Sequence, residues 1–258
     1  MARLPRVVVV DVPHHVTQRG NAQQVILDDD AACTTYLELL RRYCELYCVS
    51  LLGYCLMSNH VHLIAVPRTA QALAQSLKHT HGRYGAYWNA RQSSSGHVWQ
   101  GRFYSCPLDD SHLWTALRYV ELNPVRAGMI AIAAQYRWSS AATHCGTATG
   151  SWLEMNLWRA RWTEQTWNDY LTAGESSAEL VTLRQCTHTG RPLGTAEFVG
   201  GLENQRCGTP LHAARTPGKA VSRFSAPTIC FYDLRNGVSS VCPPIPVCPP
   251  IHLSPHLS

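Results

Sequence analysis

The chain has 258 residues, of which 45% are hydrophobic, and a formal net charge of +5. This length and composition predict one substantial hydrophobic core with an appendage, or two small domains, and they exclude a largely disordered chain. No apolar run approaches the roughly 18 to 20 residues that a membrane-spanning helix needs, so we expect no membrane partner and a cytoplasmic location.

The cysteines indicate reduced thiols rather than disulfides. There are 11 of them, an odd number, scattered along the chain and without any Cys-x-x-Cys pair. Several lie among apolar neighbours, where free cysteine behaves as a small buried hydrophobe.

Basic charge is concentrated in a segment that has no carboxylates. No Asp or Glu occurs between Glu45 and Asp109. The basic residues inside this segment are Arg68, Lys78, Arg83, Arg91 and Arg102. A basic segment without acidic residues suits a surface that receives a polyanion, so we expect a nucleic acid partner.

Strands and helices alternate through the first half of the chain. The expected strands are a short one from residue 14 to the Gly20-Asn21 turn, two at 49–57 and 60–66 joined at Ser58-Asn59, and one at 98–106. The expected helices cover about 31–48, 70–90 and 112–123, and Pro124 ends the last of them. This order predicts an α+β fold, a ferredoxin-like split βαβ sandwich with an antiparallel sheet.

The sequence texture changes twice after this region. We expect the ferredoxin-like domain to cover residues 1–145. Residues 146–207 are rich in tryptophan and predict a small helical accessory region. Residues 208–258 accumulate Pro, Ser and Gly and predict a disordered tail, because repeated prolines cannot hold regular hydrogen-bonded structure.

Two histidines in the expected strand at 60–66 are the first candidates for a functional site. Side chains alternate across a strand, so His60 and His62 should lie on one face while Val61 and Leu63 point into a core on the other. Two neighbouring neutral imidazoles form half of a metal site. Taken alone, such a pair is more often structural than metal-binding.

The helix before Pro124 can complete that site. Tyr119 and Asn123 are four residues apart and share one helix face. If this face looks toward His60 and His62, Asn123 can supply an oxygen ligand and Tyr119 lies within reach of a bound phosphate. Two imidazoles and one amide oxygen leave positions for water and phosphate, which suits Mg²⁺ or Mn²⁺ as a Lewis acid.

Other residues are candidates for contacts with nucleic acid. Arg83 and Arg102 are expected to bind backbone phosphates, and Trp99 and Phe103 to stack on unpaired bases, with core packing as the rival for Trp99. Arg126 is expected either to bind a phosphate or to pair with an acidic side chain, and the sequence favours neither. Glu121 is expected to face solvent or to pair with Arg118 or Arg126, with a position beside the metal as the alternative.

Three blocks, in the same order, resemble the REP-associated tyrosine transposases. These are relatives of the insertion sequence 200-like transposases among the HUH single-strand endonucleases, and the resemblance covers about residues 14–145. The blocks are YCLMSNHVH at 54–62, GHVWQGRF at 96–103 and RYVELNPVRAG at 118–128.

The resemblance implies metal-dependent cleavage and joining of single-stranded DNA at hairpin-forming palindromes. His60 and His62 would be ligands of Mg²⁺ or Mn²⁺, and Tyr119 the nucleophile that forms a 5′-phosphotyrosine. Asn123 stands where related transposases place a polar third ligand, often glutamine. No organic cofactor is expected, and the choice between monomer and homodimer stays open.

Two alternatives have different signatures. A non-catalytic hairpin-binding protein derived from a transposase would not need His60, His62 and Tyr119 together. A small-molecule phosphohydrolase would usually supply a nucleophilic histidine or an acidic cluster, and the segment around the histidine pair has no carboxylates.

Overall fold

The computed structural model describes residues 7–148 and 152–207. The predicted tail at 208–258 lies outside the described residues. The described residues up to Gly201 form one compact unit, and the described end of the chain from Leu202 is assigned to a second. In the described part of the chain, no helix is long and apolar enough to cross a membrane.

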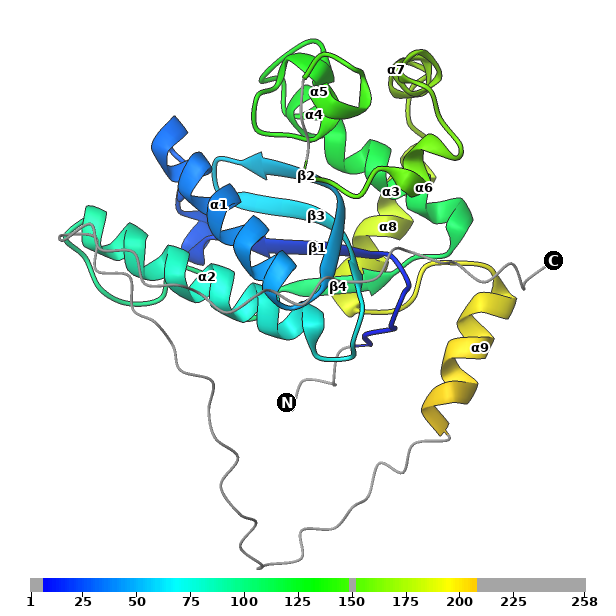
Figure 1. Ribbon diagram of the computed structural model, residues 1–258, viewed down its shortest axis with the longest axis horizontal. Coiled ribbons are helices and arrows are strands. Elements are labelled where there is room, and N and C mark those ends of the chain that lie inside the picture. The colour runs from blue at the N-terminus through cyan, green and yellow to red at the C-terminus, as the bar shows by residue number, and fades with distance from the viewer. Residues whose placement is uncertain (1–6, 149–151, 208–258) are drawn as a thin grey trace, which may run out of the picture. The chain divides into compact units, whose positions relative to one another are not determined.

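A four-stranded antiparallel sheet forms the centre of the first unit, with strand order β2-β3-β1-β4 (Figure 1). The strands are β1 (His14–Arg19), β2 (Val49–Met57), β3 (His60–Pro67) and β4 (Tyr104–Pro107). The order of strands and helices along the chain is the split βαβ order, and the α+β fold predicted from the sequence is confirmed.

Helices account for most of the remaining described residues. The longer ones are α1 (Asp30–Leu46), α2 (Ala72–Arg91), α3 (Asp110–Glu121), α7 (Glu164–Thr172), α8 (Ser177–Thr189) and α9 (Ala196–Cys207). The single-turn ones are α4 (Asn123–Arg126), α5 (Ala141–His144) and α6 (Asn156–Arg159), with 3-10 turns at Asn21–Gln23 and Ala133–Gln135. The seven cysteines from Cys33 to Cys186 are free thiols.

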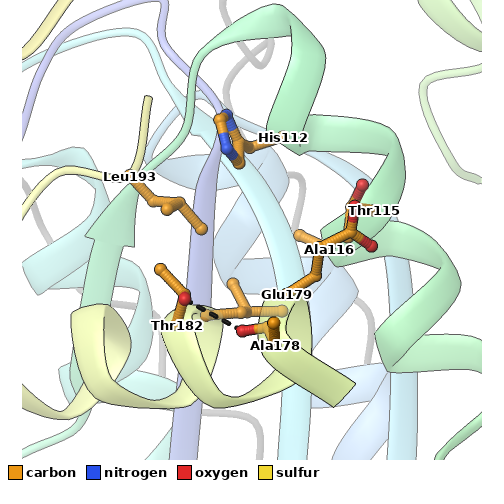
Figure 2. Close-up of a pocket in the computed structure, with 8 residues that line it drawn as sticks. His112, Thr115, Ala116, Ala178, Glu179, Thr182 and Leu193 are labelled. Atoms are coloured by element: carbon orange, nitrogen blue, oxygen red, sulfur yellow. Dashed lines mark hydrogen bonds between the residues drawn. The ribbon is translucent and has the colours of Figure 1, made fainter. Parts of the chain in front are cut away.

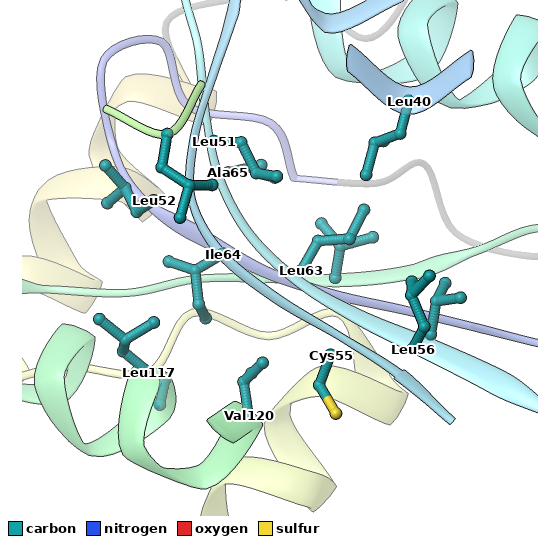
Figure 3. Packing of buried hydrophobic residues seen from close by; sticks show 14 of the residues in the cluster. Leu40, Leu51, Leu52, Cys55, Leu56, Leu63, Ile64, Ala65, Leu117 and Val120 are labelled. Atoms are coloured by element: carbon teal, nitrogen blue, oxygen red, sulfur yellow. The ribbon is translucent and has the colours of Figure 1, made fainter. Parts of the chain in front are cut away.

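The two faces of the sheet are covered by different helices. On one face, α1 and α2 pack on β2 and β3, and on the other, α3 packs on β2 and β3 while α8 packs on β4 and β1. Figure 3 shows this division, with Leu40 of α1 and Leu63 on one side of the strands and Ile64 with Leu117 and Val120 of α3 on the other. The alternation predicted for β3 is therefore present.

Local features of the sequence fix the position of α3. Asp109 caps its first turn, accepting a hydrogen bond from the backbone N–H of His112 at 2.9 Å. Gly53, next to a register shift in β2, lies where a side chain would collide with Leu117, so its lack of a Cβ lets the helix approach the sheet closely. The helix ends at Glu121, and Pro124 then occupies the first turn of α4, where its missing N–H costs nothing.

The expected strand at 98–106 is shorter than predicted. Only residues 104–107 form β4, and Trp99 makes a single isolated bridge to Gly20. The aromatic side chains that gave the segment its strand-like pattern are buried here for a different reason, because Trp99 packs among the rings of Tyr36, His81 and Tyr84.

Helices α7 and α8 pack on the core. Trp167 of α7 is fully buried, and its indole Nε1–H donates to a carboxylate oxygen of Glu121 at 2.9 Å. Glu121 also accepts hydrogen bonds at 2.5 Å from Ser140 and from His144 Nδ1. The prediction that Glu121 faces solvent or pairs with an arginine is wrong, because it is the buried centre of a network that holds α3, α5 and α7 together.

Candidate active site

The histidine pair lies on the sheet face that α3 and α8 cover. His62 is 6% exposed and His60 is half-buried, and their ring centroids are 4.9 Å apart in an edge-to-face arrangement. Tyr119 comes from the facing side of α3, with its ring 5.5 Å from that of His62. The structure thus brings His60 and His62 together with Tyr119, which lies 57 residues or more further along the chain.

A third histidine, His15 of β1, completes the cluster. Its ring stacks on His62 with centroids 5.2 Å apart, and its Nε2 lies 3.0 Å from His62 Nδ1. It also meets the edge of Tyr119 at 5.7 Å. The sequence analysis missed His15, although alternation along the strand at 14–19 places His15, Thr17 and Arg19 on one face.

Helix α8 supplies two further neighbours. The hydroxyl of Thr187 lies 2.7 Å from His15 Nδ1, and Arg184 Nε donates to the Tyr119 hydroxyl oxygen at 3.3 Å. The Arg184 guanidinium is 5.5 Å from the centre of the tyrosine ring. No sequence signal pointed to these residues, because they come from the tryptophan-rich region that was interpreted only as an accessory.

Arg126 is held in place rather than free. Its guanidinium lies over the Tyr119 ring at 4.2 Å, donates to the Tyr119 carbonyl and pairs with Glu175 at 2.6 Å. Of the two alternatives predicted for Arg126, the structure has the acidic partner. Tyr119 is therefore contacted by two guanidinium groups, those of Arg126 and Arg184.

Asn123 lies one helical turn beyond Tyr119. Its amide nitrogen donates to the carbonyls of Tyr119 and Val120, at 3.2 and 3.4 Å. These bonds occupy the nitrogen and leave the amide oxygen as the atom that a metal could use. Among the described residues, no hydrogen bond joins Asn123 to either histidine, so its role as a third ligand stays a prediction.

The histidines of the cluster are neutral near pH 7. Burial lowers the pKa of His60 to about 4 and that of His15 to about 3, and it holds the pKa of His62 well below 6.5. Nearby positive charge acts in the same direction, from Arg19 on His60 and from Arg126 on His15. Neutral imidazole is the form that binds a metal.

The histidine side chains supply only some of the ligands that a hard divalent cation needs. Within the described residues, no group of three or more His, Cys, Asp or Glu side chains is placed to hold a metal. His60 and His62 would therefore need an amide oxygen, water or a phosphate to complete the coordination. That composition is compatible with Mg²⁺ or Mn²⁺, which retain water and substrate oxygens.

Arg19 is a further residue that the sequence analysis missed. It is exposed at the end of β1 and is the cross-strand partner of His60. Paired residues of an antiparallel ladder share a face, so its side chain starts beside the histidine pair. Its Nε donates to Gln100 at 3.2 Å, and no described carboxylate pairs with it.

The residues predicted to contact nucleic acid differ in their burial. Arg83 and Arg102 are exposed, as a phosphate contact requires. Trp99 and Phe103 are only 9% and 7% exposed, and the Trp99 indole donates to the His81 carbonyl at 2.9 Å. Their expected role as base-stacking residues is corrected, since both side chains pack in the core and do not present a face to solvent.

A separate cavity of about 200 Å³ lies between α3, α8 and Leu193 (Figure 2). It contains no member of the histidine cluster. Its lining residues are His112, Thr115, Ala116, Ala178, Glu179, Thr182, Leu183 and Leu193. The cavity is therefore not counted as part of the candidate active site.

Comparisons with known proteins give one family match and several similar solved structures. Residues 8–123 match the family described as Transposase IS200 like. Similar solved structures include a REP-associated tyrosine transposase bound to a REP hairpin, with 12% sequence identity and a TM-score of 0.49 over 61% of this chain and 96% of that chain. A candidate transposase from Deinococcus radiodurans R1 has 16% identity and a TM-score of 0.33 over 46% and 96% of the two chains. No curated protein matches the chain.

An antiparallel sheet that carries a His-x-His pair beside a helix tyrosine is the arrangement expected from the sequence resemblance to the HUH single-strand endonucleases. Over residues 8–123, the chain is similar to the IS200-like transposase family.

Proposed function

We propose that this protein cleaves and rejoins single-stranded DNA at hairpin-forming repeats, with Tyr119 as the nucleophile and a divalent metal held by His60 and His62. The observation that carries the proposal is the contact between the Tyr119 ring and His62, at 5.5 Å, on a buried face that also holds His60. A structural histidine pair would not need a tyrosine hydroxyl beside it.

The residues assign each part of the reaction. The Tyr119 oxygen attacks the scissile phosphorus, a tyrosine–phosphate bond to the 5′ side forms, and the bond to the 3′ oxygen breaks to leave a 3′-hydroxyl after proton uptake. The phenol proton passes to solvent, which also supplies the proton taken up by the 3′ oxygen, and the Arg184 guanidinium stabilises the negative charge on the attacking oxygen. Rejoining is the reverse attack by a 3′-hydroxyl, which frees the tyrosine.

The bound metal would supply Lewis acidity to the phosphate and its leaving oxygen. His60 and His62 hold it through ring nitrogens, and Asn123 is the proposed oxygen ligand. Both histidines already use Nδ1 in hydrogen bonds, at 2.6 Å to Asn59 and 3.0 Å to His15, so Nε2 is the available nitrogen on each.

Exposed basic residues support DNA as the substrate. Two of the five basic residues in the carboxylate-free segment are neutralised, since Arg68 pairs with Asp11 and Arg91 with Asp29. The other three are exposed: Lys78, Arg83 and Arg102. We assign backbone contacts to Arg83 and Arg102, and a phosphate contact beside the histidines to Arg19. A hairpin substrate is proposed by analogy with the REP hairpin bound to the REP-associated tyrosine transposase.

The test follows the covalent intermediate. The full-length protein is mixed with Mn²⁺ and a pool of DNA hairpins that have single-stranded flanks and a label at the 3′ end, then separated under denaturing conditions. A 5′-phosphotyrosine predicts that a 3′ label migrates with the protein and a 5′ label does not. Tyr119→Phe should remove the adduct, whereas Tyr47→Phe, at the C-cap of α1 on the other face of the sheet, should keep it.

The outcomes separate the two candidate functions. A protein that shifts the hairpins in a native gel but gives no adduct with any divalent metal would be a non-catalytic hairpin-binding protein. An adduct that persists undiminished in Tyr119→Phe would overturn the assignment of the nucleophile.

A further inference from the structure

A line of hydrogen bonds runs from the backbone of α8 through two side chains to His62. The Thr187 hydroxyl lies 2.8 Å from the Leu183 carbonyl oxygen and 2.7 Å from His15 Nδ1. His15 Nε2 in turn lies 3.0 Å from His62 Nδ1. All three side chains are buried, so water does not compete for these positions.

The direction of this line is fixed by counting protons. A carbonyl oxygen can only accept, so the single Thr187 proton points to Leu183. The Thr187 oxygen is then an acceptor for His15 Nδ1–H. The opposite direction would leave two oxygen acceptors, those of Thr187 and Leu183, 2.8 Å apart without a proton between them.

The count continues to the metal-binding histidine. His15 contacts Thr187 and His62 through its ring nitrogens and no carboxylate, so the buried ring is neutral and carries one proton, on Nδ1. Its Nε2 must accept, and His62 Nδ1–H is the donor. His62 therefore keeps an unprotonated Nε2.

His60 reaches the same state by a shorter route. The Asn59 amide nitrogen donates to the Gln23 carbonyl at 3.3 Å, which identifies the Asn59 oxygen as the atom 2.6 Å from His60 Nδ1. His60 Nδ1–H is thus the donor, and its Nε2 is also unprotonated.

We propose that Thr187 and His15 are positioning residues that hold His62 in the Nδ1–H tautomer with Nε2 ready for the metal. The tautomer follows from the hydrogen bonds alone, and only the use of Nε2 rests on the proposed function. A partner that fixes the far nitrogen of a metal-ligating histidine is worth about 10- to 100-fold in metal affinity or activity. Thr187 lies outside residues 8–123, so α8 has a part in the site that the family match does not include.

The first test reads the tautomer without any metal. Histidine labelled with ¹⁵N is incorporated into the full-length protein, and long-range proton–nitrogen spectra assign the protonated nitrogen of His62. We expect protonated Nδ1 and unprotonated Nε2 in the wild type. Thr187→Val removes the acceptor at nearly constant shape and should change that pattern, whereas Thr187→Ser should restore it.

Thr182 provides a matched control. It lies in the same helix and makes the same type of hydrogen bond to a carbonyl four residues earlier, at 2.9 Å to Ala178, but it is exposed and contacts no histidine. Thr182→Val should leave the His62 spectrum unchanged. A protonated His62 Nε2 in the wild type, or a Thr187→Val spectrum identical to the wild type, would overturn the proposal.

The second test measures affinity for Mn²⁺ itself, by titration with detection of the free ion. Thr187→Val should weaken binding by about 10- to 100-fold, and Thr187→Ser and Thr182→Val by less than about threefold. Equal affinities for Thr187→Val and the wild type would refute the link to the metal. A wild type with the expected tautomer but no Mn²⁺ binding would instead contradict the proposed function and leave the tautomer assignment intact.

Discussion

The two faces of the sheet use the same strands for different purposes. On the face covered by α1 and α2, His81 is buried with its Nε2 3.0 Å from the Tyr36 hydroxyl, among the rings of Tyr84 and Trp99. On the face covered by α3 and α8, His62 is also buried, but its Nδ1 is bonded to His15 and its ring lies 5.5 Å from that of Tyr119. The comparison shows that burial of a histidine does not indicate function, whereas the partner of each nitrogen does.

The largest effect should separate these two histidines. His62→Gln should lower metal-dependent cleavage at least about a thousandfold, because a lost ligand costs more than a lost outer partner. His81→Gln should keep cleavage per folded molecule within about twofold while lowering the free energy of unfolding by about 1 to 3 kcal/mol. Cleavage assays with urea unfolding of both variants make the measurement. Loss of cleavage in folded His81→Gln would contradict the different roles assigned to His62 and His81.

The next effect concerns the network that attaches the C-terminal helices to the functional face. Glu121→Ala should lower the free energy of unfolding by about 3 to 5 kcal/mol, since it leaves buried donors without their acceptor. These donors are on Ser140, His144 and Trp167. Glu45→Ala, which breaks the exposed Arg41 pair of α1, should cost less than about 1 kcal/mol. Urea unfolding that gives equal costs would contradict the assigned role of Glu121.

Acid should weaken both faces together. The folded pKa is about 4 for His14 and His60 and about 3 for His15 and His81, below 6.5 in each case. The unfolded chain therefore binds more protons from about pH 6.5 down to these values, so stability is full above pH 6.5 and falls as the pH falls through this window.

The expected slope is up to about 1.4 kcal/mol per pH unit for each such histidine. Urea unfolding at pH 7, 6 and 5 measures it, and His81→Gln should reduce the slope by up to one histidine's share. An unchanged slope in that variant would show that His81 does not contribute to acid unfolding.

The smallest effect should come from Arg19, the exposed basic residue beside the histidine pair. Arg19→Gln should weaken DNA binding and lower the salt dependence of the binding constant by about one phosphate contact, because Arg19 is exposed beside His60. Arg41→Gln, on α1 at the other face, serves as the control and should leave the salt slope unchanged. Binding of a fluorescent hairpin at several salt concentrations decides this, and equal slopes for Arg19→Gln and the wild type would exclude the contact.

The sequence predicted the parts of the molecule that depend on local pattern. Hairpin strands at 49–57 and 60–66 and the helices at 31–48 and 70–90 agree with the structure within a few residues, because periodicity, caps and turn residues are local signals. The segment at 98–106 was predicted less well, since Trp99 and Phe103 are buried by tertiary packing outside a strand.

The candidate site, too, was predictable from the sequence only in part. His60, His62 and Tyr119 were accessible from spacing and from the resemblance. His15 and Thr187 were not, because their contact joins residues 172 positions apart and only the folded chain brings them together. The environment of Glu121 was predicted wrongly for the same reason, since its partners lie in later helices or at the start of one.

Mass spectrometry can detect the proposed covalent bond between Tyr119 and DNA. After reaction with hairpin DNA and Mn²⁺, the protein is digested with nuclease and trypsin and analysed by mass spectrometry. Cleavage after Arg118 and Arg126 releases residues 119–126, a peptide whose single tyrosine is Tyr119. The account predicts a nucleotide on this peptide, and a nucleotide found on another tyrosine or on a histidine instead would contradict it.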